Sequence, residues 1–397
     1  MVRRTLLIVL AGGKGSRLDV LTVGRAKPSL PVGGTARLID VTMSNAANSG
    51  LRDVWVVQQY EPHLLNDHLA GGRPWDLDRL RGGLRVLPPY QGGDGEGFAS
   101  GNADALARQA RVIEAFSPEV VIVCSADHLF TLDLALVEEH HRERGAALTI
   151  VTTELTRGQD PTRHALVDVD GRGRVTGLHD KPDDPPHRIA ATEVFAYEPE
   201  ALLGTLRELG RAGEPLGDYG EALVPALIAG GRVHAYHHDG YWRDLGTPEA
   251  YLDTQLELLR PRSPFRLDDP AWPVISPAVT RAPARIDGSA HLDRAWVSPG
   301  AVVRGTVVDS IIGPGVVVER GAEVRHSVLM DDVRVGKGAS VSRAVVAEGA
   351  RVGAGARLGA PHARRPVLVG AGRRLAARAE IPAGTHLEPV DDRPLLG

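Results

Sequence analysis

The sequence predicts an α/β protein in which an open, mostly parallel, Rossmann-like sheet is followed by a parallel β-helix. Two observations predict this combination. Strand patterns alternate with helix patterns over the first 260 or so residues, which is typical of a parallel sheet with helices on both faces. Beyond residue 283 the helical spacing disappears and aliphatic residues recur about every six positions, which is the hexapeptide repeat of a parallel β-helix.

The first domain is predicted from its alternating periodicities. Residues 6–10 form a continuous apolar run that ends near glycines, as expected of a strand buried on both faces. Residues 38–47 have helical spacing and stop at Asn48-Ser49-Gly50, a suitable helix end. The same reasoning predicts strands over 54–57, 120–124 and 147–151, and helices over 103–116 and 132–144. Ligands bind beyond the carboxyl ends of such strands, so the loops at 12–17 and 125–128 are candidate sites.

The second domain is predicted from its repeating unit. Residues 261–283 are proline-rich and aperiodic, which indicates a linker. The strongest copies of the repeat that follows are Ile312-Gly313, Val335-Gly336, Val352-Gly353 and Leu358-Gly359. A Greek-key sandwich would instead alternate with a period of two and turn every ~8–12 residues. We therefore expect one domain over 1–260 and a second over 284–397 that includes a C-terminal tail.

The composition excludes several classes of function. The 397 residues are 43% hydrophobic and 24% charged, with a formal net charge of −4. Wholesale disorder is therefore excluded, and no global positive field attracts nucleic acid or anionic lipid. Cys124 is the only cysteine, which excludes an intrachain disulfide and an all-cysteine zinc site. No apolar run is long enough to span a membrane, and the N-terminal run lacks a cleavage site. We expect a cytoplasmic protein without nucleic-acid or membrane partners.

A glycine-rich loop follows the first predicted strand and reads Leu10-Ala11-Gly12-Gly13-Lys14-Gly15-Ser16-Arg17-Leu18. Its glycines allow backbone amides to approach a phosphate group, and Arg17 stands just past the turn. The dinucleotide fingerprint needs glycine in place of Leu18, and the P-loop needs glycine in place of Ile8, so neither motif is present. The alternative interpretation is a tight turn without a ligand. The phosphate interpretation makes nucleotide contacts of Leu10, Ala11, Gly12, Gly13 and Gly15.

A second cationic segment runs from Arg25 to Gly34. Pro28 and Pro31 hold this segment extended and aim Lys27 in a fixed direction. Lys27 is one of four lysines among 46 basic residues. In a chain so rich in arginine, a lysine indicates a position that favours a compact ammonium group. Lys27 and Arg17 together are suited to neutralise a polyphosphate, and a merely solvated lysine is the alternative.

These loops and several further motifs resemble the sugar-1-phosphate nucleotidyltransferases and, among them, the bacterial ADP-glucose pyrophosphorylases. The most specific matches are the segment from Arg37 to Gly50 and the block Gly240-Tyr241-Trp242-Arg243-Asp244-Leu245-Gly246-Thr247. Other matches are Gly101-Asn102-Ala103-Asp104-Ala105, Ser125-Ala126-Asp127-His128, Asp180-Lys181-Pro182 and Asp218-Tyr219-Gly220. The resemblance covers essentially the whole chain, including the β-helix, which it implies to be left-handed.

The resemblance implies a reaction and a role for each motif. The phosphate of glucose 1-phosphate attacks the α-phosphorus of ATP and pyrophosphate leaves, which supplies ADP-glucose for glycogen or another α-glucan. Arg17, Lys27 and Asp127 are then catalytic, and Asp127 and Asp244 share a Mg²⁺ ion, a hard cation that prefers carboxylate oxygens. The other implied contacts are Gly101, Asn102 and Asp104 to the nucleotide, and Asp180, Lys181, Glu193 and Asp218 to the sugar phosphate.

The resemblance also implies assembly and regulation. It predicts a homotetramer that responds to small-molecule allosteric effectors at the domain interface. Arg25 and Arg37 are candidate ligands for an anionic effector, and ordinary surface arginines are the alternative.

The chain departs from the family pattern around the sugar. Ala191-Thr192-Glu193 stands where the family usually has Ser-Met-Gly, and Asp180 stands where it usually has glutamate. These changes leave the phosphate-binding residues alone, so nucleotidyl transfer is better supported than the particular sugar. A different nucleotide or sugar 1-phosphate and a non-catalytic regulatory paralogue stay open as alternatives. An acyltransferase is a third, although His291 and His326 lie within the repeat and not in a protruding loop.

Overall fold

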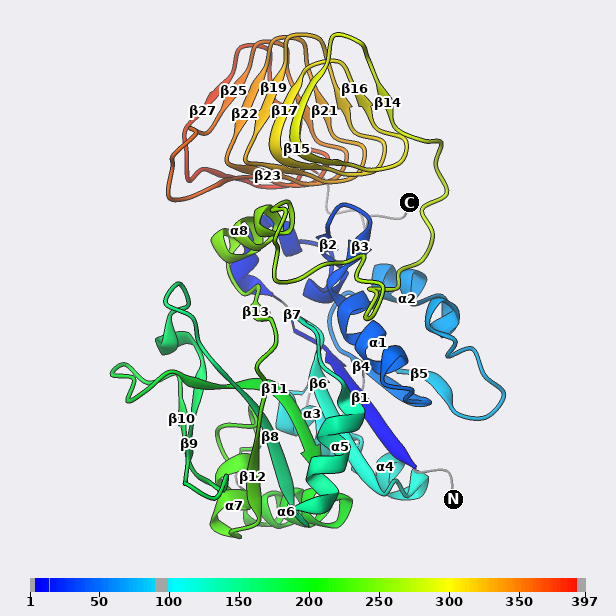
Figure 1. The fold of residues 1–397 in the computed structure, drawn as a ribbon, viewed down its shortest axis with the longest axis vertical. Coiled ribbons are helices and arrows are strands. Elements are labelled where there is room, and N and C mark those ends of the chain that lie inside the picture. The colour runs from blue at the N-terminus through cyan, green and yellow to red at the C-terminus, as the bar shows by residue number, and fades with distance from the viewer. Residues whose placement is uncertain (1–3, 14, 90–98, 214, 391–397) are drawn as a thin grey trace.

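The computed structural model describes residues 4–13, 15–89, 99–213 and 215–390. Figure 1 shows an N-terminal α/β domain and, stacked at one end of it, a coil of short strands that forms the C-terminal domain. The predicted combination of an α/β domain with a parallel β-helix is confirmed.

The N-terminal domain is built on a nine-stranded sheet. Its centre is the parallel array β6-β1-β4-β5, in which the side chains of β1 are almost all buried because both faces of the sheet are covered. β11 continues this array antiparallel to β6 and leads to β9 and β10, while β8 and β12 branch from β11. The strands are β1 (Thr5–Ala11), β4 (Asp53–Gln58), β5 (Gly83–Leu87), β6 (Val120–Ser125), β8 (Leu148–Glu154), β9 (Ala165–Val169), β10 (Val175–Asp180), β11 (Ile189–Tyr197) and β12 (Val233–His237).

Helices cover both faces of this sheet (Figure 1). They are α1 (Leu38–Asn48), α2 (Pro62–Leu69), α3 (Asn102–Arg108), α4 (Ala110–Phe116), α5 (Leu134–Glu143), α6 (Pro199–Ala212), α7 (Leu223–Ala229) and α8 (Pro248–Leu258). The single helix expected over 103–116 is two helices that meet at Gln109. The φ and ψ of Gln109 are −92° and −2°, and its N–H bonds the carbonyl of Leu106, so the last turn of α3 tightens and the axis breaks there. No helix in the described ranges is long and apolar enough to cross a membrane.

The C-terminal domain is a parallel β-helix. Val318, Val335 and Val352 are in register on successive coils and point into the core, where each is at most 2% exposed. The repeat predicts these buried positions because each coil places its aliphatic residue above the previous one. The strands are β14 (Arg285–Ile286), β15 (His291–Val297), β16 (Val302–Val303), β17 (Thr306–Ile312), β18 (Val317–Val318), β19 (Glu323–Arg325), β20 (Val328–Leu329), β21 (Arg334–Val335), β22 (Ser340–Ser342), β23 (Ala344–Val346), β24 (Arg351–Val352), β25 (Arg357–Leu358), β26 (Val367–Val369), β27 (Glu380–Ile381) and β28 (His386–Leu387).

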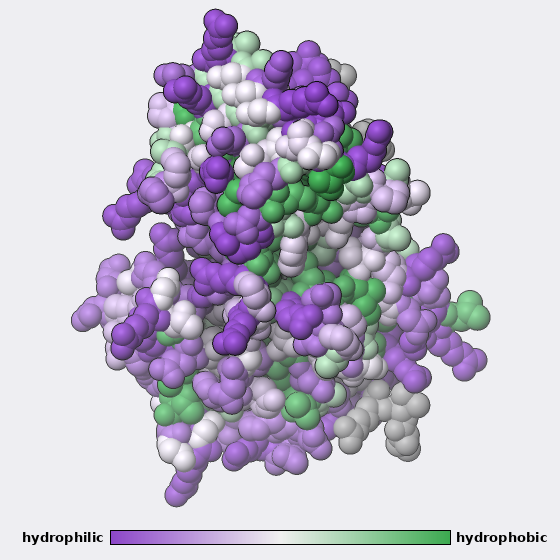
Figure 2. All heavy atoms as spheres, turned by 45° about the horizontal axis from the view of Figure 1, so that its top comes forward, coloured by the Kyte–Doolittle hydropathy of each residue, from purple (hydrophilic) through white to green (hydrophobic). Residues whose placement is uncertain are grey.

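A buried ion pair joins the two domains. Both terminal nitrogens of the Arg25 guanidinium donate to the carboxylate of Glu348 in the β-helix. Burial opposes ionisation of both groups, yet each holds the other charged: the pKa of Arg25 is raised and that of Glu348 is lowered. Arg343 also donates to Asp253 on α8 at 2.9 Å. Hydrophobic side chains gather where the domains meet on the face in Figure 2. The β-helix therefore braces the segment that carries Lys27.

A buried histidine on α5 makes the stability of the fold dependent on pH. His141 is 4% exposed, and its Nδ1 lies 2.9 Å from Oγ1 of Thr149. Burial lowers the pKa of His141 to about 4, whereas an unfolded histidine titrates near ~6.5. Between these pH values the unfolded state binds more protons. We expect His141 to destabilise the fold progressively as pH falls through this window, by up to about 3 kcal/mol, and to have no effect above it.

Denaturant unfolding from pH 7.5 down to pH 4.5 tests this prediction. The variant His141→Gln keeps a partner for Thr149 but does not titrate, so it should lose less stability than the parent as pH falls. His63→Gln, at an exposed position on α2, is the control. A stability difference between parent and His141→Gln that stays constant with pH would contradict the prediction.

Candidate active site

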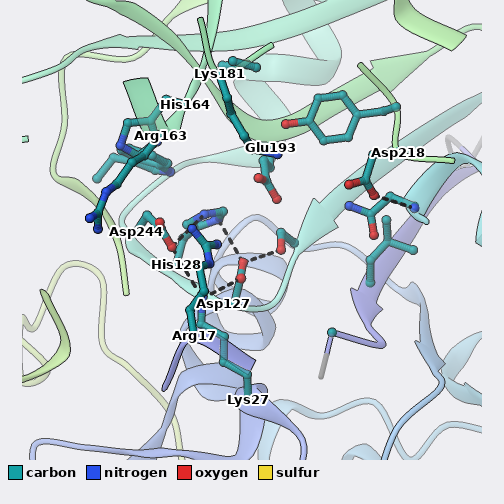
Figure 3. Close-up of a pocket in the computed structure, with 18 of the residues that line it drawn as sticks. Arg17, Lys27, Asp127, His128, Arg163, His164, Lys181, Glu193, Asp218 and Asp244 are labelled. Carbon is teal, nitrogen blue, oxygen red and sulfur yellow. Dashed lines mark hydrogen bonds and ion pairs between the residues drawn. The ribbon is translucent and has the colours of Figure 1, made fainter. Parts of the chain in front are cut away.

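A cavity of about 180 Å³ lies beyond the carboxyl ends of β1 and β6, where ligands bind in parallel sheets (Figure 3). It is polar and collects side chains from many elements of the N-terminal domain. Ten of the residues expected at the site line it: Leu10, Gly13, Arg17, Lys27, Asn102, Asp127, Lys181, Glu193, Asp218 and Asp244. Six others do not line it: Ala11, Gly12, Gly15, Gly101, Asp104 and Asp180.

A two-stranded ladder brings the two predicted metal-binding aspartates together. β7 (His128–Phe130) pairs antiparallel with β13 (Trp242–Asp244), and Asp244 lies opposite His128. Asp127 directly precedes β7, so its carboxylate lies beside that of Asp244 although more than a hundred residues separate them. Nδ1 of His128 lies 3.4 Å from Asp127 and its Nε2 lies 3.7 Å from Asp244.

Lys27 lies between these carboxylates. The short 3₁₀-helix η2 (Lys27–Ser29) begins at Lys27 and has Pro28 in its first turn. The ammonium donates to Oδ2 of Asp127 at 2.7 Å and to Oδ1 of Asp244 at 3.4 Å. Burial lowers the pKa of Lys27, but the two carboxylates outweigh burial and hold it above its usual value. Lys27 in turn holds the pKa of Asp127 far below its usual value against the opposing effect of burial. Lys27 and Asp127 are therefore both charged at neutral pH.

The glycine-rich loop packs on Lys27. Gly15 has φ +67° and precedes the 3₁₀-helix η1 (Ser16–Thr22), which carries Arg17 into the cavity. A Cβ atom at Gly15 would lie 2.9 Å from Cβ of Lys27. Gly15 therefore lets the chain turn and approach Lys27, and its own surface does not line the cavity. Lys14, from the same loop, lies outside the described residues.

The loop before α3 is held by a close backbone approach. A Cβ atom at Gly101 would lie 2.2 Å from the carbonyl carbon of Gly217, so glycine is required there. The N–H of Asn102 donates to Oδ1 of Asp218 at 3.1 Å, and both residues line the cavity. Asp104 instead accepts from the N–H of Ser100 and pairs with Arg108 at 3.2 Å, so its carboxylate is bonded within its own segment and not to the cavity.

Lys181 reaches into the cavity from the loop after β10. Its backbone has φ +45°, and its N–H donates to the carbonyl of His164 at 3.2 Å. Its ammonium lies 3.7 Å from Oδ1 of Asp180 and its side chain is 53% exposed, so this cation is available to an incoming anion.

Glu193 is the most unusual residue of the cavity. It lies on β11 where the register with β8 shifts, and its φ is +59°. Its carboxyl group, that of Asp127 and the ring of His128 each place a ligand atom within 4.8 Å of the others. Burial, and then Asp127 and Asp244, raise the pKa of Glu193.

Sequence reasoning missed two cavity residues. Arg163 is the last residue of the one-turn 3₁₀-helix η4 (Pro161–Arg163), which Asp160 caps by accepting from Thr162, and His164 follows it. Burial lowers the pKa of His164 to about 4, so the ring is neutral at pH 7. The sequence around Asp160 is typical of a helix N-cap, but nothing local in the sequence indicates that this turn faces the cavity.

The donor set fits a hard divalent cation. The carboxylates of Asp127 and Asp244 converge on one cation, the Lys27 ammonium, and Glu193 adds a third carboxyl nearby. Oxygen ligands of this kind suit Mg²⁺ and similar ions better than they suit soft metals.

The cavity beyond the carboxyl ends of β1 and β6 contains cations and paired aspartates that are suited to bind phosphate groups and a metal ion. Residues 6–260 match the family model described as nucleotidyl transferase. Residues 280–365 match a second model, described as GlmU-like, C-terminal hexapeptide. The chain belongs to the nucleotidyl transferase family. Nucleotidyltransferases of this kind generally use a divalent metal ion.

The chain is similar to several curated proteins named glucose-1-phosphate adenylyltransferase. The protein from Fervidobacterium nodosum is 34% identical over 332 residues, which cover 84% of this chain and 80% of the relative. The protein from Thermotoga neapolitana is 36% identical, with 80% of this chain and 75% of the relative covered. The protein from Clostridium novyi is 32% identical, with 80% and 84% covered. The predicted family is therefore confirmed.

Proposed function

We propose that the protein transfers the adenylyl group of ATP to glucose 1-phosphate, releasing pyrophosphate and forming ADP-glucose for the synthesis of glycogen or another α-glucan. The observation that carries the proposal is the arrangement of Arg17, Lys27 and Lys181 around the paired aspartates in one cavity. Relatives with this activity in their names cover most of the chain.

The reaction requires positioning and charge neutralisation more than proton transfer. The attacking group is a phosphate oxygen that is already anionic, so a general base is not needed. Arg17 and Lys27 hold the triphosphate, and Lys181 holds the sugar phosphate and lowers the repulsion between the two anions. The backbone near Leu10 and Gly13 contacts the nucleotide, whereas Asn102 and Asp218 order the neighbouring wall.

We assign the metal to Asp127 and Asp244 and propose Mg²⁺ as the ion. When bound, it neutralises charge on the phosphates of ATP. The Asp127 carboxylate accepts hydrogen bonds but donates none, because its pKa is far below neutrality and it carries no proton.

Lys181→Ala tests the role of the exposed cation. We expect the KM for glucose 1-phosphate to rise by about tenfold or more, with a smaller effect on the KM for ATP, because the variant removes a charge-assisted contact to one substrate only. Steady-state kinetics with each substrate varied in turn measure this split. Lys337→Ala, in the β-helix, is the matched control. An unchanged KM for the sugar phosphate would exclude the role.

A pyrophosphate-release assay over a panel of nucleoside triphosphates and sugar 1-phosphates tests the proposed reaction and its alternatives. Among neutral sugar 1-phosphates, glucose 1-phosphate with ATP should give the highest rate if both substrates are as proposed, and another neutral pair would identify a different nucleotide or sugar. No release with any pair, in the presence of candidate effectors, would favour the non-catalytic paralogue.

We propose a catalytic domain over 1–260, a linker over 261–283 and a β-helix domain over 284–397, assembled as a cytoplasmic homotetramer. Light scattering on the purified chain tests the oligomeric state.

We place a small anionic effector in a cavity of about 160 Å³ between the domains, which Arg37, His68 and Arg281 line. Arg25, the other candidate, is 2% exposed and bonded to Glu348, so it does not face this effector.

A further inference from the structure

Glu193 keeps a charged side chain in a backbone conformation that opposes it. Its φ of +59° lies in the left-handed region, which only glycine adopts without strain. The same local register shift turns its side chain into the cavity, where burial and two aspartates oppose its charge. Glycine at this position would remove both the backbone strain and the cost of burying a carboxyl group. A residue retained under strain at a ligand cavity indicates a functional group.

Glu193 has no bonded counter-ion among the described residues, although His128 and Lys27 lie near enough to favour its charged form. Its carboxylate makes no hydrogen bond or ion pair with any residue in the described ranges. Figure 3 shows it between Lys181 and Asp127 in that view. The pKa of the Tyr219 hydroxyl is raised well above its usual value by burial and then by Glu193, Asp180 and Asp218. Of these three acidic residues, Glu193 and Asp218 line the cavity.

The two lysines of the cavity have other partners. Lys27 is bonded to Asp127 and Asp244. Lys181 is the anchor of the sugar phosphate under the proposed function, on which this inference rests. A neutral sugar would therefore leave the carboxylate of Glu193 without a bonded partner once water is excluded, whereas an ammonium group on the sugar would supply one.

We infer that this end of the cavity is built for a sugar 1-phosphate that carries a protonated amino group, and that Glu193 selects that substrate over a neutral sugar. The reaction is unchanged: a phosphate oxygen bonds to the α-phosphorus of ATP, the bond to pyrophosphate breaks, and the amino group takes no part. Glu193 acts by pairing with the ammonium group, and a desolvated charge pair of this kind discriminates by about 10- to 100-fold.

The test compares kcat/KM for glucosamine 1-phosphate and glucose 1-phosphate in the parent, Glu193→Gln and Glu193→Gly. Glu154→Gln, at an exposed position on the neighbouring strand β8, is the control. We expect the parent to prefer the amino sugar by about tenfold or more, and Glu193→Gln to lose that preference because it keeps the shape and removes the charge. N-acetylglucosamine 1-phosphate, which has the nitrogen but not the charge, should not be preferred over glucose 1-phosphate.

Several outcomes would overturn the inference. A parent ratio of one or less, or a ratio that Glu193→Gln does not change, would contradict selection by charge. A Mg²⁺ requirement that rises equally with both sugars in Glu193→Gln would make the residue a metal ligand instead. If neither sugar releases pyrophosphate, the proposed function fails. If glucose 1-phosphate reacts and the preference is absent, only this inference fails.

The thermal stability of Glu193→Gly supplies a readout independent of activity. If strain and charge burial are retained for function, the variant should melt higher than the parent, by about 2 °C or more. A lower melting temperature would show that the side chain has a structural role and would overturn the inference.

Discussion

Replacing Asp127 by asparagine is expected to lower turnover with Mg²⁺ by about a thousandfold or more, because a neutral amide is a poor ligand for a hard cation that neutralises the reacting phosphates. The residue contacts Lys27 at 2.7 Å and lies beside His128. Single-turnover formation of pyrophosphate at saturating ATP, over a range of Mg²⁺ concentrations, measures the effect.

The folding of this variant must be measured alongside its activity. Lys27 has only 5% of its side chain exposed, and breaking a buried ion pair destabilises a protein by about 3–5 kcal/mol. Denaturant unfolding separates an inactive folded enzyme from an unfolded one. Asp67→Asn, on the exposed side of α2, is the control. Folded Asp127→Asn with near-normal turnover would exclude Asp127 as the metal ligand.

The fold was predictable where the signal repeats. Val318, Val335 and Val352 share one environment on successive coils, so the period alone locates the core of the β-helix. The apolar run that becomes β1 likewise predicts a central parallel strand. The break at Gln109 was not predictable in this way, because the helical spacing continues across it and only the local backbone geometry changes.

The sequence identified most residues of the site but not how their side chains are arranged relative to one another. Motifs identified Lys27, Asp127 and Asp244, and the ladder between β7 and β13 supplies the contact between them that no motif states. Arg163 was missed because one arginine among so many carries no local signal. The strain at Glu193 was beyond prediction, because a positive φ depends on how β11 pairs with its neighbours.

Long-range pairing also links the catalytic segment to the β-helix. Arg25 and Glu348 are distant in sequence, and neither is an unusual residue in this composition. Their contact places a buried charge pair two residues before Lys27. Arg37, which lines the interdomain cavity, lies just after this segment and donates to the carbonyl of Ser29 within it at 2.6 Å. A ligand in that cavity would therefore act on the chain that positions Lys27, which is the physical basis of the proposed regulation.

Lys27→Met should change catalysis and metal binding in opposite directions. The ammonium of Lys27 contacts both Asp127 and Asp244, so it would compete with a divalent cation for the same carboxylates. Removing it should tighten the binding of Mn²⁺ alone, used as a spectroscopic substitute for Mg²⁺, by about tenfold. It should also reduce kcat by about 100- to 1000-fold, because a preorganised charge facing the triphosphate is lost.

Lys27→Arg is the informative companion to this variant. Gly15 packs against Cβ of Lys27, and the planar guanidinium cannot replace a compact ammonium between two carboxylates at this separation. We therefore expect arginine to restore little of the turnover. Weaker Mn²⁺ binding in Lys27→Met would show that the lysine supports the metal site, and full activity in Lys27→Arg would show that any positive charge suffices. The first result would contradict competition between Lys27 and the metal, and the second would contradict a requirement for a compact ammonium group at this position.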